Sequence, residues 1–222
     1  MHSGHRQRMR ERIEKHGIDS LTDHEFLEYL LYYVQPRVNT NEQAHRLMNA
    51  YGSVSKVLES DADSLMEIEG IGPRSAEFLS VIPEICRRYY LDKYSPKNVF
   101  VSLDALLEYL KKMFLGISEE AAAIVLLDGS RGLIASKFIA RGNIREVYIN
   151  QKQILFEAIQ KKAPYVVLAH NHPSNQPRPS SEDFVLTQHL AAALGVAGIE
   201  LMDHVILCPN GSYYSFSKEG SL

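Results

Sequence analysis

Apolar residues recur at the helical spacing of three to four positions from Gln7 to about Tyr90. The segment 26–34 shows this spacing clearly, with apolar residues at positions 26, 27, 30, 31 and 34. Asp23 is a candidate N-cap for that helix, and Pro36 ends it because proline cannot continue a helix. The pattern therefore predicts an N-terminal region made of short helices.

The pattern changes after residues 92–98 (DKYSPKN), a polar segment with one proline that we interpret as a linker. Beyond it, apolar runs of strand length occur between segments with helical spacing. Strands are expected at 121–127, 133–139, 165–169, 199–207 and 212–217, and helices at 103–114, 153–161 and 183–194. We therefore predict an all-helical domain at 1–94 and, at 99–222, a mixed α/β or α+β domain whose sheet is flanked by helices.

Composition and charge narrow the class of protein. The 222 residues are 45% hydrophobic and 23% charged, which excludes disorder, collagen and coiled coil as the main architecture. A net charge of -3 excludes a global basic field for nucleic acid.

The apolar-rich stretch 26–34 is far shorter than the roughly 20 residues that cross a bilayer, and the polar start of the chain is unlike a secretory signal. Cys86 and Cys208 are too few for a disulfide framework, so we expect a cytoplasmic protein without membrane contact.

The segment 165–184 (YVVLAHNHPSNQPRPSSEDF) carries the most informative polar residues. His170 and His172 are two positions apart, so both imidazoles point to one side if the strand geometry continues past Ala169. Asp183 comes at the start of the next expected helix, where its carboxylate can complete a three-ligand site. Two histidines and one carboxylate suit zinc, and three protein ligands leave a fourth position for water, as in catalytic zinc sites.

A structural interpretation of the same segment stays open. Ser180 and Asp183 have the S-x-x-D spacing of a helix cap, with an acid in the first turn. That interpretation leaves His170 and His172 unexplained at the polar end of an apolar strand, where an imidazole without partners is unfavourable. Spacing alone therefore permits both a metal site and a capped helix.

The residues 170–173 (HNHP), followed by Ser180 and Asp183, resemble the JAMM signature H-x-H-P…S-x-x-D of the JAB/MPN metalloprotease superfamily. The form HNHPS followed by PSSED is similar to the RadC family within it, whose members similarly carry an N-terminal helical region before a JAB-type domain. The resemblance implies a JAB/MPN-like fold and a Zn2+ ion held by His170, His172 and Asp183. It also implies hydrolysis of amide or isopeptide bonds in an unknown protein substrate.

The resemblance further implies a general base at the start of the domain's first strand, where Glu119 and Glu120 are adjacent. RadC relatives place this glutamate eight residues before a strand-ending aspartate, which favours Glu120 with Asp128 as the anchor and leaves Glu119 as the alternative. Zinc would activate a water and Glu120 would take its proton. Ser180 would donate to the developing oxyanion if the cap leaves its hydroxyl free.

A second motif lies at residues 65–79, where Gly70-Ile71-Gly72-Pro73 joins two helical segments and resembles the helix-hairpin-helix of DNA-binding proteins. Glycines let a phosphate approach the backbone, and the N–H groups of a helix start face it. Glu67 and Glu69 oppose such contact, and similar hairpins join helices for packing alone. Non-specific DNA contact through the Gly70–Gly72 hairpin would support the alternative function, a DNA-binding, repair-associated factor with a structural or vestigial metal.

Three further polar residues have weaker patterns. Asp203 and His204 are adjacent in an alternating strand and point to opposite faces unless a bulge intervenes, so we interpret both as structural. His189 is interpreted as an ordinary residue on a helix face.

Overall fold

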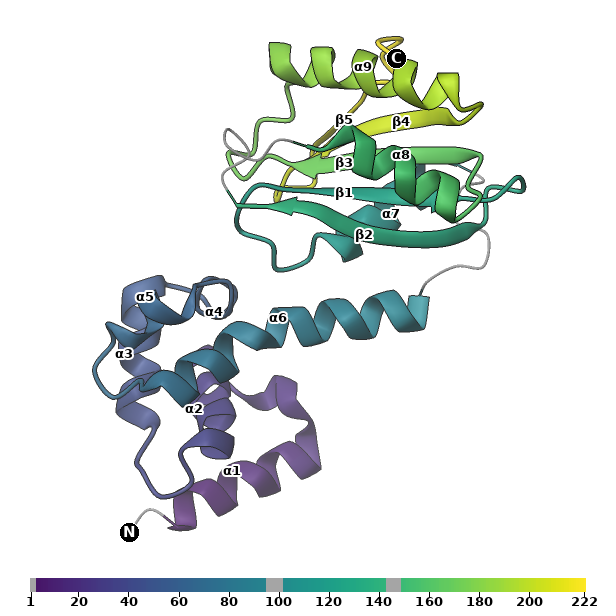
Figure 1. Ribbon diagram of the computed structural model, residues 1–222. Helices are drawn as coiled ribbons and strands as arrows, with labels where there is room; N and C mark the ends of the chain where they lie inside the picture. The colour runs from purple at the N-terminus through teal and green to yellow at the C-terminus, as the bar shows by residue number, and fades with distance from the viewer. Residues whose placement is uncertain (1–2, 95–101, 143–148) are drawn as a thin grey trace. The chain divides into compact units, whose positions relative to one another are not determined.

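The computed structural model describes residues 3–94, 102–142 and 149–222 (Figure 1). Contacts among these residues divide the chain into two compact units, Met1–Cys86 and Arg87–Leu222, which we call the N-terminal and C-terminal units. The described helices do not include one that is both long enough and apolar enough to span a membrane.

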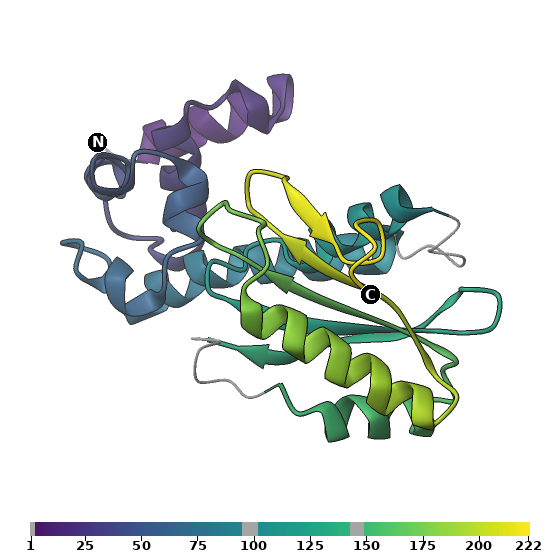
Figure 2. The ribbon, with the colours of Figure 1, turned by 90° about the horizontal axis from the view of Figure 1, so that it is seen from above.

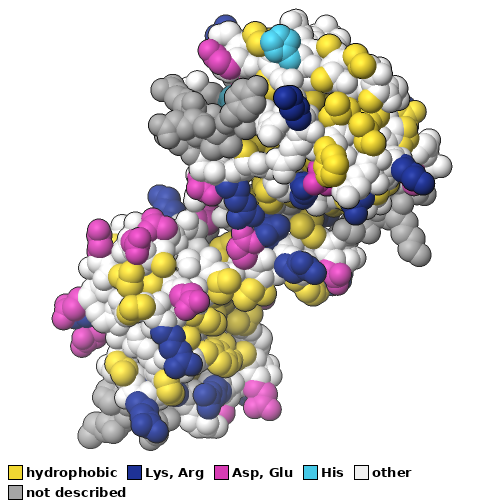
Figure 3. Space-filling view, viewed as in Figure 1, with side chains coloured by type: hydrophobic (Ala, Val, Ile, Leu, Met, Phe, Trp, Pro, Cys, Tyr) yellow, Lys and Arg dark blue, Asp and Glu magenta, His cyan; other side chains and the backbone are white. Residues whose placement is uncertain are grey.

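The N-terminal unit is built from helices, as predicted. Its elements are α1 (Ser3–His16), the 3-10 helix η1 (Ile18–Ser20), α2 (Asp23–Val34), α3 (Asn41–Tyr51), α4 (Val54–Leu58), α5 (Ala62–Met66) and the first part of α6 (Pro73–Tyr94), which continues past the boundary at Cys86. The apolar faces of α2 to α6 meet in one core, in which Leu27, Leu47 and Leu79 are fully buried. On the face shown in Figure 3, acidic and basic side chains lie interspersed over this unit, so that face carries mixed charge.

Two local expectations for this half were wrong. The N-cap of α2 is Thr22 rather than Asp23, which is the first helical residue. The N–H and the hydroxyl of Thr22 both donate to the Glu25 carboxylate, at 2.9 and 3.0 Å, and this bonding sets the start of the helix. The expected linker also begins too early, because α6 continues to Tyr94, and its residues 95–98 lie outside the described residues.

The described part of the C-terminal unit contains a mixed sheet of five strands in the order β2-β1-β3-β4-β5. The elements are α7 (Leu103–Met113), β1 (Ala121–Leu127), β2 (Leu133–Arg141), α8 (Gln151–Gln160), β3 (Tyr165–Asn171), α9 (Ser181–Val196), β4 (Glu200–Leu207) and β5 (Tyr213–Ser215). β3 and β4 are parallel, and the other neighbouring strands are antiparallel. A helical region followed by a mixed sheet with flanking helices confirms the predicted fold class.

Helices cover both faces of the sheet, with α7 on one face and α8 and α9 on the other (Figures 1 and 2). Val125 and Val167 belong to the core beneath α7, whereas Ile124 and Leu168 belong to the core beneath α8 and α9. Successive side chains of a strand point to opposite faces. His170, two residues after Leu168, is therefore on the α9 face of β3.

A bulge in β4 determines which of its polar residues share that face. Val166 pairs with Leu201 but Val167 pairs with Asp203, so β4 has one extra residue between these partners. The extra residue reverses the alternation along the rest of β4. Asp203 consequently faces α7 and His204 faces α9.

Candidate metal centre

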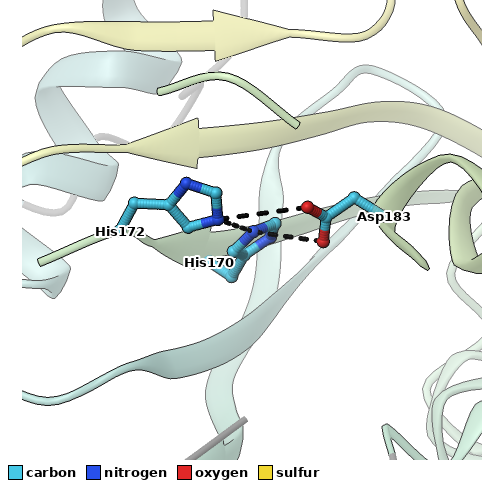
Figure 4. Close-up of side chains that lie close together, drawn as sticks. All are labelled: His170, His172 and Asp183. Carbon is cyan, nitrogen blue, oxygen red and sulfur yellow. Dashed lines mark hydrogen bonds and ion pairs between the residues drawn. The ribbon is translucent and has the colours of Figure 1, made fainter. Parts of the chain in front are cut away.

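His170, His172 and Asp183 come together where β3 ends and α9 begins (Figure 4). His170 lies within β3, His172 follows the strand by one residue, and Asp183 is in the first turn of α9. The Nε2 atom of His170 is 3.0 Å from Nε2 of His172 and 3.4 Å from Oδ1 of Asp183. Nε2 of His172 is 4.0 Å from Oδ2 of Asp183. The structure thus brings together the three residues predicted from their spacing.

The donor atoms suit zinc in kind and in separation. Two imidazole nitrogens and a carboxylate oxygen are a common ligand set for catalytic zinc. Atoms about 2.0–2.1 Å from a tetrahedral ion are about 3.3 Å from one another. The two imidazole nitrogens are 3.0 Å apart, and the carboxylate oxygens Oδ1 and Oδ2 are 3.4 Å from His170 and 4.0 Å from His172, so the separations bracket that value. The residues therefore fit the metal that the resemblance implies.

The protonation of both imidazoles is compatible with metal binding. Nδ1 of His172 is 2.9 Å from the carbonyl oxygen of Gln176, and a carbonyl only accepts. Nδ1 therefore carries the proton of the neutral ring, and Nε2 has a free lone pair. His170 is 3% exposed, and burial lowers its pKa below the usual range, with Asp183 acting in the opposite direction and His172 lowering it further. Near neutral pH the His170 ring is therefore neutral.

Asp183 also takes part in the capping box that the alternative interpretation described. Its Oδ2 accepts from the N–H and the hydroxyl of Ser180, at 2.8 and 2.7 Å, while its N–H donates to Oγ of Ser180 at 3.1 Å. Its other oxygen, Oδ1, is the atom nearer to His170. The cap and the three-residue cluster therefore coexist. The hydroxyl proton of Ser180 is donated to Oδ2 of Asp183. The oxyanion role of Ser180 stays a prediction.

The strand register distinguishes Glu120 from Glu119. β1 and β3 are antiparallel with Ala122 opposite His170, so continuing the register by two residues places Glu120 opposite His172. Residues opposite one another share a face, and adjacent residues alternate. Glu120 is therefore on the face of the two imidazoles and is half-buried, whereas Glu119 is exposed. The register favours Glu120 as the base, a role that stays a prediction.

Asn171, between the two histidines, joins the end of β3 to the backbone that leads into β1. Its Oδ1 accepts from the N–H of Ala121 at 2.7 Å, and its Nδ2 donates to the carbonyl of Glu119 at 2.9 Å. Both bonds hold the backbone on either side of Glu120.

His204 is the residue whose surroundings the sequence interpretation missed. It is completely buried, and its Nε2 lies 2.8 Å from Nδ1 of His170. Its Nδ1 lies 2.6 Å from Oγ1 of Thr187 in α9. Alternation along the strand predicts that only one of Asp203 and His204 faces the cluster. The bulge in β4 decides which of the two it is. His189 is exposed, as expected for a helix-face residue.

The Gly70–Gly72 hairpin lies in the other unit, between α5 and α6. The carbonyl of Gly70 accepts from the side-chain amides of Gln35 and Gln43, at 3.0 and 3.1 Å. Gly70 has a φ of +89°, and a Cβ there would lie 2.7 Å from Nε2 of Gln43. Gly70 therefore has a packing role within the unit, and DNA contact through the hairpin stays a prediction.

Comparisons with known proteins cover both units. A family model for the RadC-like JAB domain matches residues 100–221, and a UPF0758 N-terminal model matches residues 2–77. A UPF0758 protein from Fusobacterium nucleatum subsp. nucleatum is 33% identical over 225 residues, covering 98% of this chain and 96% of the relative. One from Carboxydothermus hydrogenoformans is 33% identical over 212 residues, covering 96% and 93%. One from Paracidovorax citrulli is 31% identical over 226 residues, covering 96% and 95%.

Proposed function

Because the chain belongs to the RadC-like JAB domain family, we propose that it is a zinc-dependent hydrolase of the JAMM type. Its substrate would be a protein, cleaved at a peptide or isopeptide bond. The observation that carries this proposal is the convergence of His170 Nε2, His172 Nε2 and the Asp183 carboxylate at the end of β3. When bound there, zinc supplies a Lewis acid that lowers the pKa of water to about 7.

The chain's own residues would move the protons of the reaction. A carboxylate oxygen of Glu120 takes a proton from the attacking water as the water oxygen bonds to the substrate carbonyl carbon. Glu120 then delivers that proton to the departing amine nitrogen as the carbon–nitrogen bond breaks. Asn171 holds the backbone on both sides of Glu120, which limits the movement of the carboxylate.

Ser180 would assist at the substrate carbonyl oxygen. Its hydroxyl donates to Oδ2 of Asp183, with the two oxygens 2.7 Å apart. During the reaction that proton would turn to the carbonyl oxygen as negative charge develops there. Oδ2 of Asp183 would keep its bond from the N–H of Ser180, so the helix cap would persist.

A comparison of Glu120→Gln and Glu119→Gln tests the proposal on a library of peptides and isopeptide-linked peptides, with products identified by mass spectrometry. We expect Glu120→Gln to lower cleavage by about 100-fold or more, the usual contribution of a general base, while zinc content stays unchanged. Glu119→Gln, the matched control, should cleave like the wild type. Equal cleavage by Glu120→Gln would contradict the assignment of the base. Lack of cleavage by the zinc-loaded wild type would favour the DNA-binding alternative.

A further inference from the structure

We infer that Thr187 and His204 are positioning residues that hold the ring proton of His170 on Nδ1 and leave its Nε2 free to bind a metal. The Thr187–His204 relay, as we call it, runs from the carbonyl oxygen of Asp183 through Thr187 and His204 to His170. The inference rests on the proposed function for the identity of the ion. The proton positions rest on hydrogen bonds within this chain.

The relay begins at the hydroxyl of Thr187, one helical turn after Asp183. Its Oγ1 lies 2.6 Å from the carbonyl oxygen of Asp183 and 2.6 Å from Nδ1 of His204. A carbonyl oxygen only accepts, and a hydroxyl has one proton. The hydroxyl of Thr187 therefore donates its hydrogen bond to the backbone carbonyl of Asp183. At its other contact, Oγ1 of Thr187 accepts a hydrogen bond from the N–H at Nδ1 of His204.

The same assignment of donors and acceptors extends to His204. A neutral imidazole has one N–H, and here it is on Nδ1, so Nε2 is an acceptor. Nε2 lies 2.8 Å from Nδ1 of His170, which must therefore donate. The His204 ring is completely buried and stacks on Phe216, with ring centroids 4.6 Å apart and planes 8° apart. Packing thus fixes the ring orientation on which this bond depends.

The consequence is a set of lone pairs that face one another. Nε2 of His170 and Nε2 of His172 are both acceptors 3.0 Å apart, and Oδ1 of Asp183 is a third acceptor 3.4 Å from His170. Such a set is unfavourable alone and favourable around a cation. Thr187 is 1% exposed, so solvent does not easily replace its hydroxyl in the relay. The relay therefore prepares His170 as a ligand before the ion arrives.

Nitrogen NMR of the metal-free, full-length protein with 15N-labelled histidine tests the relay directly, because the ring correlations distinguish the two tautomers. We expect His170 to be protonated on Nδ1 in the wild type. Thr187→Val keeps the shape but removes the acceptor, so the protons of His204 and His170 should both move to Nε2. Thr187→Ser keeps the hydroxyl and should restore the wild-type tautomer. An Nε2-protonated His170 in the wild type, or an unchanged tautomer in Thr187→Val, would overturn the inference.

Zinc affinity, measured by competition with a chromophoric chelator, gives the second readout. Thr187→Val should weaken binding by about 10- to 100-fold, the usual effect of losing the partner of a ligating histidine. Thr187→Ser and the control His189→Ala should bind like the wild type. Equal affinity in Thr187→Val would count against the relay. A wild type that has the Nδ1 tautomer but binds no zinc would leave the relay standing and would refute the proposed function.

Discussion

At the scale of single residues, Asp183 takes part in two structures because its two oxygens have different partners. Oδ2 accepts from Ser180 in the cap of α9, and Oδ1 is the atom near His170. A carboxylate held by two hydrogen bonds on one side has little freedom to turn. The cap of α9 therefore also orients a ligand atom of the candidate metal centre.

Gly70 gives a prediction at the same scale. Its φ of +89° is unfavourable for other residues, and an added Cβ would lie 2.7 Å from Nε2 and 2.9 Å from Cγ of Gln43, which is 7% exposed. Gly70→Ala should therefore lower the free energy of unfolding of the N-terminal unit by about 3 kcal/mol, from backbone strain and overpacking together. Chemical denaturation of the full chain measures this loss.

Gly52→Ala is the matched control for this prediction. Gly52 also has a positive φ, +78°, but a Cβ there would meet no described atom within 4 Å. We expect a loss of about 1 kcal/mol from backbone strain alone. Equal losses for Gly52→Ala and Gly70→Ala would show that the contact with Gln43 is unimportant.

The sequence predicted the residues of the cluster better than it predicted their surroundings. The two-residue spacing of His170 and His172 places both side chains on one face in any extended strand, so their proximity follows from local geometry. The position of His204 depends on a bulge that inserts one residue between the partners of β3. Bulges depend on pairing between distant strands, and alternation within β4 alone does not locate them.

At the scale of secondary structure elements, the start of α2 predicts a pH dependence of stability. Burial raises the pKa of Glu25, but the Arg12 guanidinium 2.6 Å away and the N–H and hydroxyl of Thr22 outweigh it and lower the pKa from 4.5 to about 2. A carboxylate whose pKa is lower in the folded state stabilises that state above its unfolded pKa. This contribution should be fully present above pH 4.5 and should be lost as the pH falls towards 2.

Urea unfolding of the wild type and Glu25→Gln at several pH values measures this effect. The variant should be less stable by about 1 kcal/mol above about pH 5, because it lacks the charged partner of Arg12 and Thr22. The difference should shrink as the pH falls towards the folded pKa of about 2. A difference that is independent of pH would contradict the assigned cause.

The local hydrophobic pattern predicted the type and position of these elements well. It predicted the residues at which they end less well. β1 spans Ala121–Leu127 as expected, because a continuous apolar run is bounded by polar residues on both sides. α9 was expected to end before Gly195 but includes it and ends at Val196. A glycine near a helix end is a weak stop signal when the backbone can continue in the helical region.

At the scale of the whole molecule, the folding of each unit depends on its own apolar core. The cores of the C-terminal unit lie between the sheet and its covering helices, and the candidate ligands His170, His172 and Asp183 are not among their members. Metal binding would therefore add stability by mass action without being required for folding. This differs from small zinc domains, which unfold without their metal.

The most direct test of the account is the zinc content of the full-length protein, measured by elemental analysis after zinc loading and removal of free ions. We predict one zinc per chain in the wild type and in the control His189→Ala, and none in His172→Ala. Circular dichroism should show the same helix and sheet content in all three proteins, because the cores do not include the ligands. A wild type without stoichiometric zinc, or a His172→Ala variant that retains it in full, would contradict the central claim.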